Sequence, residues 1–271
     1  RSEGASENLS NTTFYTYKVI NRSSNTYSDF YAGWWADADV GTATDDFVGC
    51  DVSRGMGYAF NGDVIDEPSS SSQGYGEYPP ATGIDFVLGM QEDPDNQDNP
   101  LTEDYEEAFS NQGLMYPGAG TGFGDDVVDN ERRGMSHFVF YNNSGNPING
   151  EPVIAGHFYN YLRAVWKNGA PMIYGGDGVS PATGALEGVF VNAMFPGESD
   201  PFFWSMGGND PGAEPWTEVS SGNHPADRRF VMSMGPVTLE WGSSKDFTMA
   251  ALWARDNSEV GANVGAREGV S

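Results

Sequence analysis

The sequence predicts an all-β protein, a two-sheet β-sandwich of jelly-roll-like form with one or two short helices and long acidic loops. Glycine (36 residues) and proline (16 residues) interrupt the 271-residue chain at short intervals. Such punctuation, with short apolar runs between the breaks, is typical of strands joined by turns. Hydrophobic residues make up 38% of the chain and aromatic residues 13%, which is enough for a core between two sheets.

The predicted strands follow one another along the chain. Residues 14–20 are rich in aromatic and β-branched side chains and end at a turn over 21–25, and we expect 27–35 to be their partner strand. Residues 57–60 lead into Asn61-Gly62-Asp63, which is typical of a type I′ hairpin turn. Further strands are predicted at 84–88, 137–141, 188–195, 229–234, 237–241 and 247–253. The last strand is apolar on both faces, as expected where two sheets pack face to face.

One segment departs from the β pattern. Residues 154–166 carry large apolar side chains at helical spacing and end at Asn168-Gly169, so they predict an amphipathic helix packed over the sandwich. Its apolar side chains are Phe158, Tyr161, Leu162, Val165 and Trp166.

The chain divides into one main domain and two flanking segments. We expect a single β-sandwich domain over residues 14–255, an N-terminal extension over 1–13 and a linker-like segment over 256–271. Long surface loops are expected at 66–80 and 91–104, and loops of this length are usually functional or disordered.

The charge of the chain is strongly acidic. The sequence has 13 basic and 39 acidic residues, a formal net charge of −26. Nucleic acids and anionic membranes would repel such a surface, so we expect no nucleic-acid partner and no membrane insertion. Bound divalent cations, a saline habitat that screens repulsion, or selection for solubility each explain the charge. We favour cations in a marine or extracellular setting.

A run of carboxylates follows the apolar segment 30–35. Asp37, Asp39, Asp45, Asp46 and Asp51 fall within fifteen residues, separated by small residues and glycines. Carboxylates this close repel one another unless a cation lies among them, and Ca²⁺ takes six to eight oxygens on flexible loops. The sequence therefore predicts a structural Ca²⁺ ion held by the first four aspartates, with Asp51 as a further ligand or support. A solvated acidic turn is the alternative.

The EF-hand pattern is absent from this stretch, because the twelfth loop position is not Glu and position five is Gly41. Three other acidic stretches are weaker metal candidates. Asn61-Gly62-Asp63 with Asp66 is explained by a hairpin turn, and residues 93–99 are explained equally well by a mobile acidic loop. The cluster at 124–129 is followed by Arg132 and Arg133, which favours local ion pairing.

Signatures of catalysis are largely missing, and we predict no catalytic residue. His137, His157 and His224 are far apart in the sequence with no motif around them. Cys50 is the single cysteine, and acidic neighbours raise a thiol pKa, so we expect a small buried hydrophobe.

A carbohydrate-active protein remains an alternative. Glycoside hydrolysis needs two carboxylates about 5–10 Å apart, a condition that so acidic a chain neither excludes nor locates. Trp204, Trp216 and Trp241 are candidates for stacking on sugar rings, although tryptophans in a sandwich mostly fill its core.

Several segments together resemble a known family. They are Trp35-Ala-Asp37-Ala-Asp39-Val-Gly41, Asp45-Asp46-Phe-Val-Gly49-Cys50-Asp51, Tyr58-Ala-Phe-Asn61-Gly62-Asp63, Phe158-Tyr-Asn-Tyr161 and Asp227-Arg-Arg-Phe-Val-Met-Ser233-Met-Gly235-Pro236. In this order they resemble β-rich domains of large secreted surface proteins of Bacteroidetes and related bacteria, often exported by type IX secretion. The chain departs from the family at Trp241-Gly242, where relatives tend to have Pro-Gly.

The resemblance implies an extracellular or cell-surface location and neighbouring modules, but no reaction. Together these observations favour an extracellular, calcium-stabilised structural or adhesive module without catalysis. Its expected partners are other modules of the same polypeptide or surface assembly, with glycans or homotypic contacts also open. The alternatives are a carbohydrate-binding or glycoside-hydrolysing domain and a self-assembling surface-layer or filament subunit.

Overall fold

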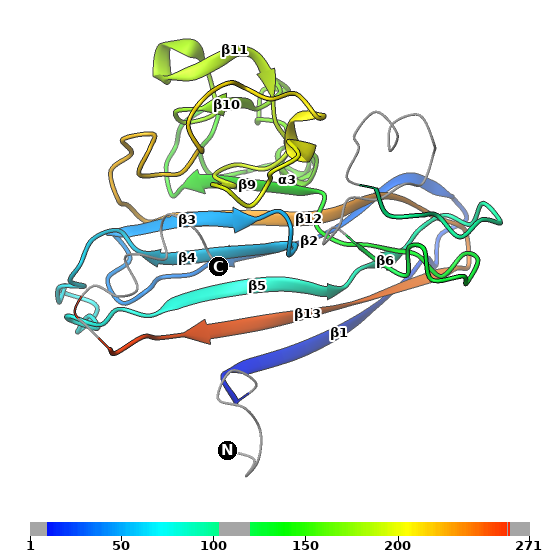
Figure 1. Cartoon of the computed structure of the whole chain (residues 1–271), viewed down its shortest axis with the longest axis horizontal. Helices are drawn as coiled ribbons and strands as arrows, with labels where there is room; N and C mark the ends of the chain where they lie inside the picture. The colour runs from blue at the N-terminus through cyan, green and yellow to red at the C-terminus, as the bar shows by residue number, and fades with distance from the viewer. Residues whose placement is uncertain (1–9, 103–119, 259, 261–271) are drawn as a thin grey trace.

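A computed structural model describes residues 10–102, 120–258 and 260 of the chain, and it confirms the all-β class (Figure 1). Most of the regular structure is antiparallel sheet, and α3 (Ala155–Leu162) is the one α-helix described over its full length. Most of the predicted extension 1–13, most of the predicted linker 256–271 and positions 103 and 104 of the second long loop lie outside the described residues.

Two sheets form the sandwich. The first has five strands in the order β1-β13-β5-β4-β3, and the second has three in the order β2-β12-β9. The strands of the first sheet are β1 (Thr12–Ile20), β3 (Asp46–Asp51), β4 (Met56–Asn61), β5 (Ala81–Leu88) and β13 (Ser244–Ala254). Those of the second are β2 (Tyr27–Asp37), β9 (His137–Asn142) and β12 (Arg228–Leu239). The jelly-roll description stays a prediction.

The two sheets approach closely at a glycine. A Cβ atom on Gly57 of β4 would lie 2.6 Å from the ring of Phe138 and 3.0 Å from that of Phe230, both on the opposite sheet. Those two rings are buried with their centroids 5.2 Å apart. On the other side of the core, Trp34 of β2 lies against Tyr17 of β1 at 5.8 Å between centroids. The core therefore extends across both sheets.

One predicted strand pairing is wrong, and one predicted strand boundary is absent. The segments 14–20 and 27–35 lie in different sheets, because β1 pairs with β13 and β2 pairs with β12. Buried Asn21 explains this, since its side-chain amide donates to the carbonyls of Asn25 and Leu239 and turns the chain toward the second sheet. The predicted strands 229–234 and 237–241 are one continuous strand, β12, which ends at Leu239.

The predicted hairpin at Asn61-Gly62-Asp63 is also wrong. A type I′ turn centred on Asn-Gly needs positive φ at both Asn61 and Gly62, and neither residue has it. Instead, the Gly62 N–H donates to the carbonyl of Asp45 at 2.6 Å, and the Asn61 amide donates to the carbonyl of Asp63. The chain then runs through residues 62–80 before β5 pairs with β4.

A segment over residues 192–199 closes one side of the sandwich. Met194 N–H donates to the Phe138 carbonyl on β9 at 3.1 Å, and the Cys50 N–H of β3 donates to the Phe195 carbonyl at 3.2 Å. These bonds connect β9 and β3, which are edge strands of the two sheets. The segment therefore covers both edge strands at this position. The predicted strand 188–195 is therefore split, because β11 (Ala185–Phe190) ends before this segment begins.

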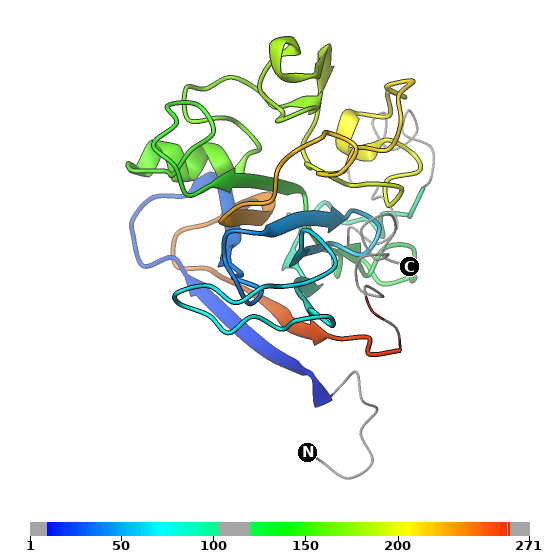
Figure 2. The same ribbon diagram turned by 90° about the vertical axis from the view of Figure 1, so that its left-hand side faces the viewer.

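Residues 143–227 form a third layer over the outer face of the β2–β12–β9 sheet (Figures 1 and 2). The layer contains α3, the hairpin of β10 (Ile173–Gly175) and β11, and the 3₁₀ turns Pro181–Thr183 and Trp204–Met206. The predicted helix 154–166 is shorter than expected, because Ala164 adopts a positive φ of 53°. This turn carries Trp166 into the core, where its indole N–H donates to Gly178 at 2.9 Å.

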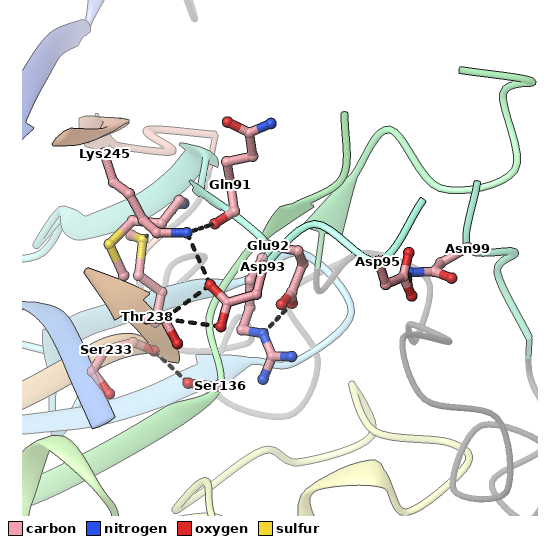
Figure 3. Close-up of polar contacts among 12 residues, drawn as sticks. Gln91, Glu92, Asp93, Asp95, Asn99, Ser136, Ser233, Thr238 and Lys245 are labelled. Atoms are coloured by element: carbon pink, nitrogen blue, oxygen red, sulfur yellow. Dashed lines mark hydrogen bonds and ion pairs between the residues drawn. The ribbon is translucent and has the colours of Figure 1, made fainter. Parts of the chain in front are cut away.

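A small sheet of β6 (Met90–Gln91), β8 (Arg132–Arg133) and β7 (Gly120–Thr121) lies beside the sandwich. Figure 3 shows how the acidic loop after β6 is tied to the main sheets. The Asp93 carboxylate accepts from the Thr238 N–H at 2.9 Å and from Lys245 Nζ at 3.2 Å, and Glu92 pairs with Arg133. Basic groups and backbone amides thus neutralise this part of the acidic surface.

A buried ion pair joins the third layer to the sandwich. Glu218 and Arg228 have side chains only 0% and 3% exposed, with Arg228 Nε 2.9 Å and Nη2 3.0 Å from the two carboxylate oxygens. Arg228 also donates to the His224 carbonyl and to Asn142, so most of its N–H groups are satisfied. Breaking such a pair from one side leaves an uncompensated buried charge.

We therefore expect Arg228→Met to lower the free energy of unfolding by about 3–5 kcal/mol, because it leaves the Glu218 carboxylate buried without a cation. Urea denaturation measures this value. Arg22→Met is the matched control, since Arg22 is exposed and far from the pair in the sequence, and we expect it to change stability by less than about 0.5 kcal/mol. Equal effects of the two substitutions would contradict a stabilising role for the pair.

Candidate metal centre

The predicted aspartates gather, with one exception, at one end of the sandwich, the left-hand end in Figure 1. There β2 ends at Asp37, the loop 38–45 leads into β3, and β4 ends at Asn61. The segment before β12 reaches the same place, because the Ala226 N–H donates to the Asp46 carbonyl at 3.1 Å. We call this region the acidic end.

Three carboxylates form an outer triad at the acidic end. Ligand oxygens of Asp37, Asp39 and Asp227 lie within 4.8 Å of one another, the only such set of His, Cys, Asp or Glu side chains in the described part of the chain. Arg229 faces Asp37 across the β2–β12 ladder and lies 3.0 Å from it and 3.7 Å from Asp227. One guanidinium therefore neutralises part of the triad.

Deeper in the same end, three oxygens have no hydrogen-bond partner. They are Asp45 Oδ1, Asp46 Oδ1 and Asn61 Oδ1, which we call the inner oxygens. Asp46 and Asn61 are directly opposite each other on β3 and β4, so their side chains lie on the same face, and each residue is only 2% exposed. The second oxygen of Asp46 accepts from the Val40 N–H at 2.9 Å.

A further carboxylate, Asp66, anchors the surrounding loops. It is fully buried and accepts from the Thr42 N–H at 3.0 Å and from the Tyr75 N–H at 2.7 Å. Gly41 makes room for it, because a Cβ there would lie 1.6 Å from Asp66 Oδ2, and the φ of Gly41 is +78°. A side chain at position 41 would clash with the Asp66 carboxylate and would also strain the backbone, so this position requires glycine.

Burial and mutual repulsion strongly perturb these groups. Burial raises the pKa of Asp46 to about 8, with Asp45, Asp39 and Asp66 adding to the rise and the Val40 amide opposing it. Burial, followed by the charge of Asp66, raises the pKa of Asp45 to about 6. At neutral pH these carboxylates therefore need a compensating positive charge. Either a bound proton or a metal cation supplies it.

Asp51 does not belong to this group. It lies at the opposite end of β3, about 16 Å from Asp46 for a strand of this length. Its buried carboxylate pairs with Arg54 at 2.7 Å and accepts from Ser53 Oγ at 2.8 Å. The segment Asp46–Asp51 is a buried strand and not a flexible loop, so its two ends cannot meet at one ion.

The structure therefore divides the five predicted residues. Asp37 and Asp39 join Asp227, while Asp45 and Asp46 join Asn61 and Asp66. Asn61 and Asp66 were visible in the sequence only as a weaker candidate, and Asp227 carried no local signal because it reaches the site through the β2–β12 pairing.

The other acidic stretches bond to the backbone. Asp98 accepts from the N–H groups of Gly124 at 2.8 Å and Asp126 at 2.6 Å, so it holds two loops together. The predicted ion pairs within residues 124–133 are wrong, because Arg132 pairs with Asp246 and Arg133 pairs with Glu92.

Two of the remaining candidates are structural. Cys50 is buried as predicted, its thiol donates to the Met194 carbonyl, and burial raises its thiol pKa well above the ordinary value. Trp216 is 2% exposed and its indole N–H donates to Ser221 Oγ, so it fills the core and offers no face to a sugar.

Comparisons with family models, with curated proteins and with solved structures found no match to this chain. The resemblance to secreted surface proteins of Bacteroidetes stays a prediction. Among the described residues, no helix is both long and apolar enough to span a membrane.

The raised pKa of Asp46 leads to a pH prediction for the protein in EDTA. The folded state binds a proton at Asp46 up to about pH 8, whereas the unfolded chain releases it near pH 4. The stability that this proton supplies is present at low pH and is lost as the pH rises through this window. We expect the free energy of unfolding of the wild type, relative to Asp46→Asn, to fall by several kcal/mol between pH 5 and 8, at about 1.4 kcal/mol per pKa unit.

Urea denaturation of both proteins at a series of pH values measures this difference. Using the difference removes the contributions of other titrating groups, such as His137, whose pKa burial lowers to about 4. A difference that stays constant or rises with pH would contradict an uncompensated Asp46 carboxylate.

Proposed function

We propose that this protein is an extracellular, calcium-stabilised structural or adhesive module whose Ca²⁺ ion is bound at the acidic end of the sandwich. One observation carries the proposal: three buried oxygens, Asp45 Oδ1, Asp46 Oδ1 and Asn61 Oδ1, have no hydrogen-bond partner. Buried acceptors without a partner are rare because each costs free energy, and a cation among them satisfies all three at once.

The chemistry of the donors favours calcium over other metals. All are hard oxygens from carboxylates and a side-chain amide, with no cysteine or histidine among them, which disfavours zinc and copper. Ca²⁺ accepts six to eight oxygens in irregular geometry, so backbone carbonyls and water complete its coordination. Asp66 is close enough to add negative charge. The outer triad of Asp37, Asp39 and Asp227 is a weaker second position, because Arg229 already compensates part of its charge.

The ion stabilises the fold by joining segments that are distant in the sequence. It links the start of β3 to the end of β4, and through the Ala226–Asp46 hydrogen bond it supports the entry to β12. An extracellular location is consistent with a weak calcium site, because extracellular modules bind this ion at about 10⁻⁴–10⁻³ M.

We expect 10 mM CaCl₂ to raise the melting temperature by about 5–10 °C relative to EDTA. An ion at a hundred times its dissociation constant adds about 2.7 kcal/mol, and a chain of this size gains about 2–4 °C per kcal/mol. Differential scanning calorimetry measures the shift. Asp45→Asn/Asp46→Asn should abolish it, whereas Asp51→Asn should retain it because Asp51 lies elsewhere. No shift in the wild type, or an equal shift in the double variant, would contradict the proposed ligands.

A second candidate function, homotypic assembly, is favoured by the edge strand β1. Within the described residues β1 pairs only with β13, so its outer edge presents unpaired backbone groups. Phe14 is 52% and Tyr15 43% exposed along this edge, and such an edge is a template for pairing with another chain.

Homotypic assembly through β1 predicts dimers or larger species at tens of micromolar in 150 mM salt with calcium, measured by light scattering after size exclusion. Phe14→Lys should give monomers, because an edge lysine blocks strand pairing. Val87→Lys is the matched control, since Val87 is exposed on the central strand β5 of the same sheet, and this variant should still assemble. A monomeric wild type would eliminate this candidate.

A further inference from the structure

A polar hollow of about 390 Å³ opens where the third layer meets the β2–β12–β9 sheet. Its walls come from four places: the end of β9, the loop over residues 144–149, the turn between β10 and β11, and the segment leading into β12. A volume of this size is within the range of small-molecule sites. We call it the asparagine pocket, because Asn142, Asn146, Asn149 and Asn223 line it.

Several polar side-chain groups in the pocket make no hydrogen bond within the described part of the protein. The side chains of Asn149 and His224 take part in no hydrogen bond within the described structure, although both line the pocket. Asp177 uses one oxygen, Oδ1, to accept from the Val179 N–H at 3.0 Å and from Thr183, and its Oδ2 is unused. The pocket thus presents a free amide, a free imidazole and a free carboxylate oxygen.

The floor of the pocket is rigid. The buried pair of Glu218 and Arg228 lies beneath it, and Arg228 fixes the Asn142 side chain by donating to its oxygen. That bond orients the Nδ2 donors of Asn142. Asn223 is held in the same way, since its Nδ2 donates to Glu218 at 2.8 Å. These side chains are ordered before any ligand arrives, which lowers the entropic cost of binding.

The electrostatics disfavour an anionic ligand. Arg228 is the one lysine or arginine in the lining, and its guanidinium is engaged by Glu218, Asn142 and the His224 carbonyl. An anion would therefore meet no free cation, and the net charge of −26 would repel it. A cationic ligand would find a single carboxylate among neutral amides. Amide and imidazole groups suit a neutral ligand whose groups both donate and accept hydrogen bonds.

We propose that the asparagine pocket binds a neutral saccharide. Sugar hydroxyls donate to Asp177 Oδ2 and accept from the amides of Asn142 and Asn149, and His224 either donates or accepts according to its tautomer. The aromatic ring in the lining, Phe140, is buried, so recognition rests on hydroxyl groups and not on stacking. The pocket accommodates one or two sugar units at the end of a chain. The proposal is independent of calcium at the acidic end, because none of these four side chains belongs to that site.

Saturation-transfer difference NMR on the full chain with 5 mM CaCl₂ tests the proposal. The probes are the methyl glycosides of glucose, galactose, mannose, xylose, fucose and N-acetylglucosamine, with the corresponding disaccharides. We expect saturation transfer to at least one neutral sugar. Asn149→Ala and His224→Ala should each weaken its binding about tenfold, as for the loss of one or two hydrogen bonds. Neither side chain bonds within the protein, so both variants should keep the wild-type melting temperature.

Matched controls separate this pocket from other surfaces. Asn257→Ala removes an exposed asparagine outside the pocket, and Trp241→Ala removes the most exposed tryptophan, at 70%; both should retain wild-type sugar binding. Three outcomes would overturn the proposal: no transfer to any sugar, unchanged binding in Asn149→Ala/His224→Ala, or binding of citrate or putrescine in preference to the neutral sugars.

Discussion

Repulsion among buried carboxylates is the constraint on which the acidic end depends. Asp45, Asp46 and Asp66 converge where β3 begins and β4 ends, and backbone N–H groups hold the carboxylates of Asp46 and Asp66 there. Gly41 must be a glycine to let Asp66 approach, and the loop 62–80 must return far enough to deliver it. Removing several charges from water costs free energy that nearby positive charge or hydrogen-bond donors must offset, and Asp45 Oδ1 and Asp46 Oδ1 have no donor. The local fold is therefore incomplete without a proton or a cation.

Other buried acids in the chain are compensated on both carboxylate oxygens. Asp51 pairs with Arg54, Glu218 pairs with Arg228, and the two oxygens of Asp200 accept from donors on Trp204 and Ser205. Within the described residues neither Asp45 nor Asp46 has a basic partner, and Oδ1 of each has no hydrogen-bond partner. This contrast distinguishes the inner oxygens from the general acidity of the surface, and it singles out their position for a bound ion.

Local patterns in the sequence predicted most of the strands, because the alternation of apolar and polar residues and the turn-forming residues are signals that span only a few positions. They did not predict strand partners, since the choice of β13 for β1 depends on the buried Asn21 turn and on residues more than 200 positions away. The same limit applies to the site. Asp45 and Asp46 were identified from spacing alone, whereas Asp227 enters through long-range pairing. Asp51 was misplaced because a buried strand was taken for a loop.

The acidic end and the asparagine pocket share one support, the segment before β12, where Ala226 bonds to Asp46 and Arg228 bonds to Glu218. The central claim is that a calcium ion occupies the inner oxygens. Crystals grown with calcium and measured at a long X-ray wavelength test it most directly. The account predicts an anomalous peak about 2.3–2.6 Å from Asp45 Oδ1, Asp46 Oδ1 and Asn61 Oδ1. Density for water alone, or a direct hydrogen bond between Asp46 and Asn61 without a peak, would contradict it.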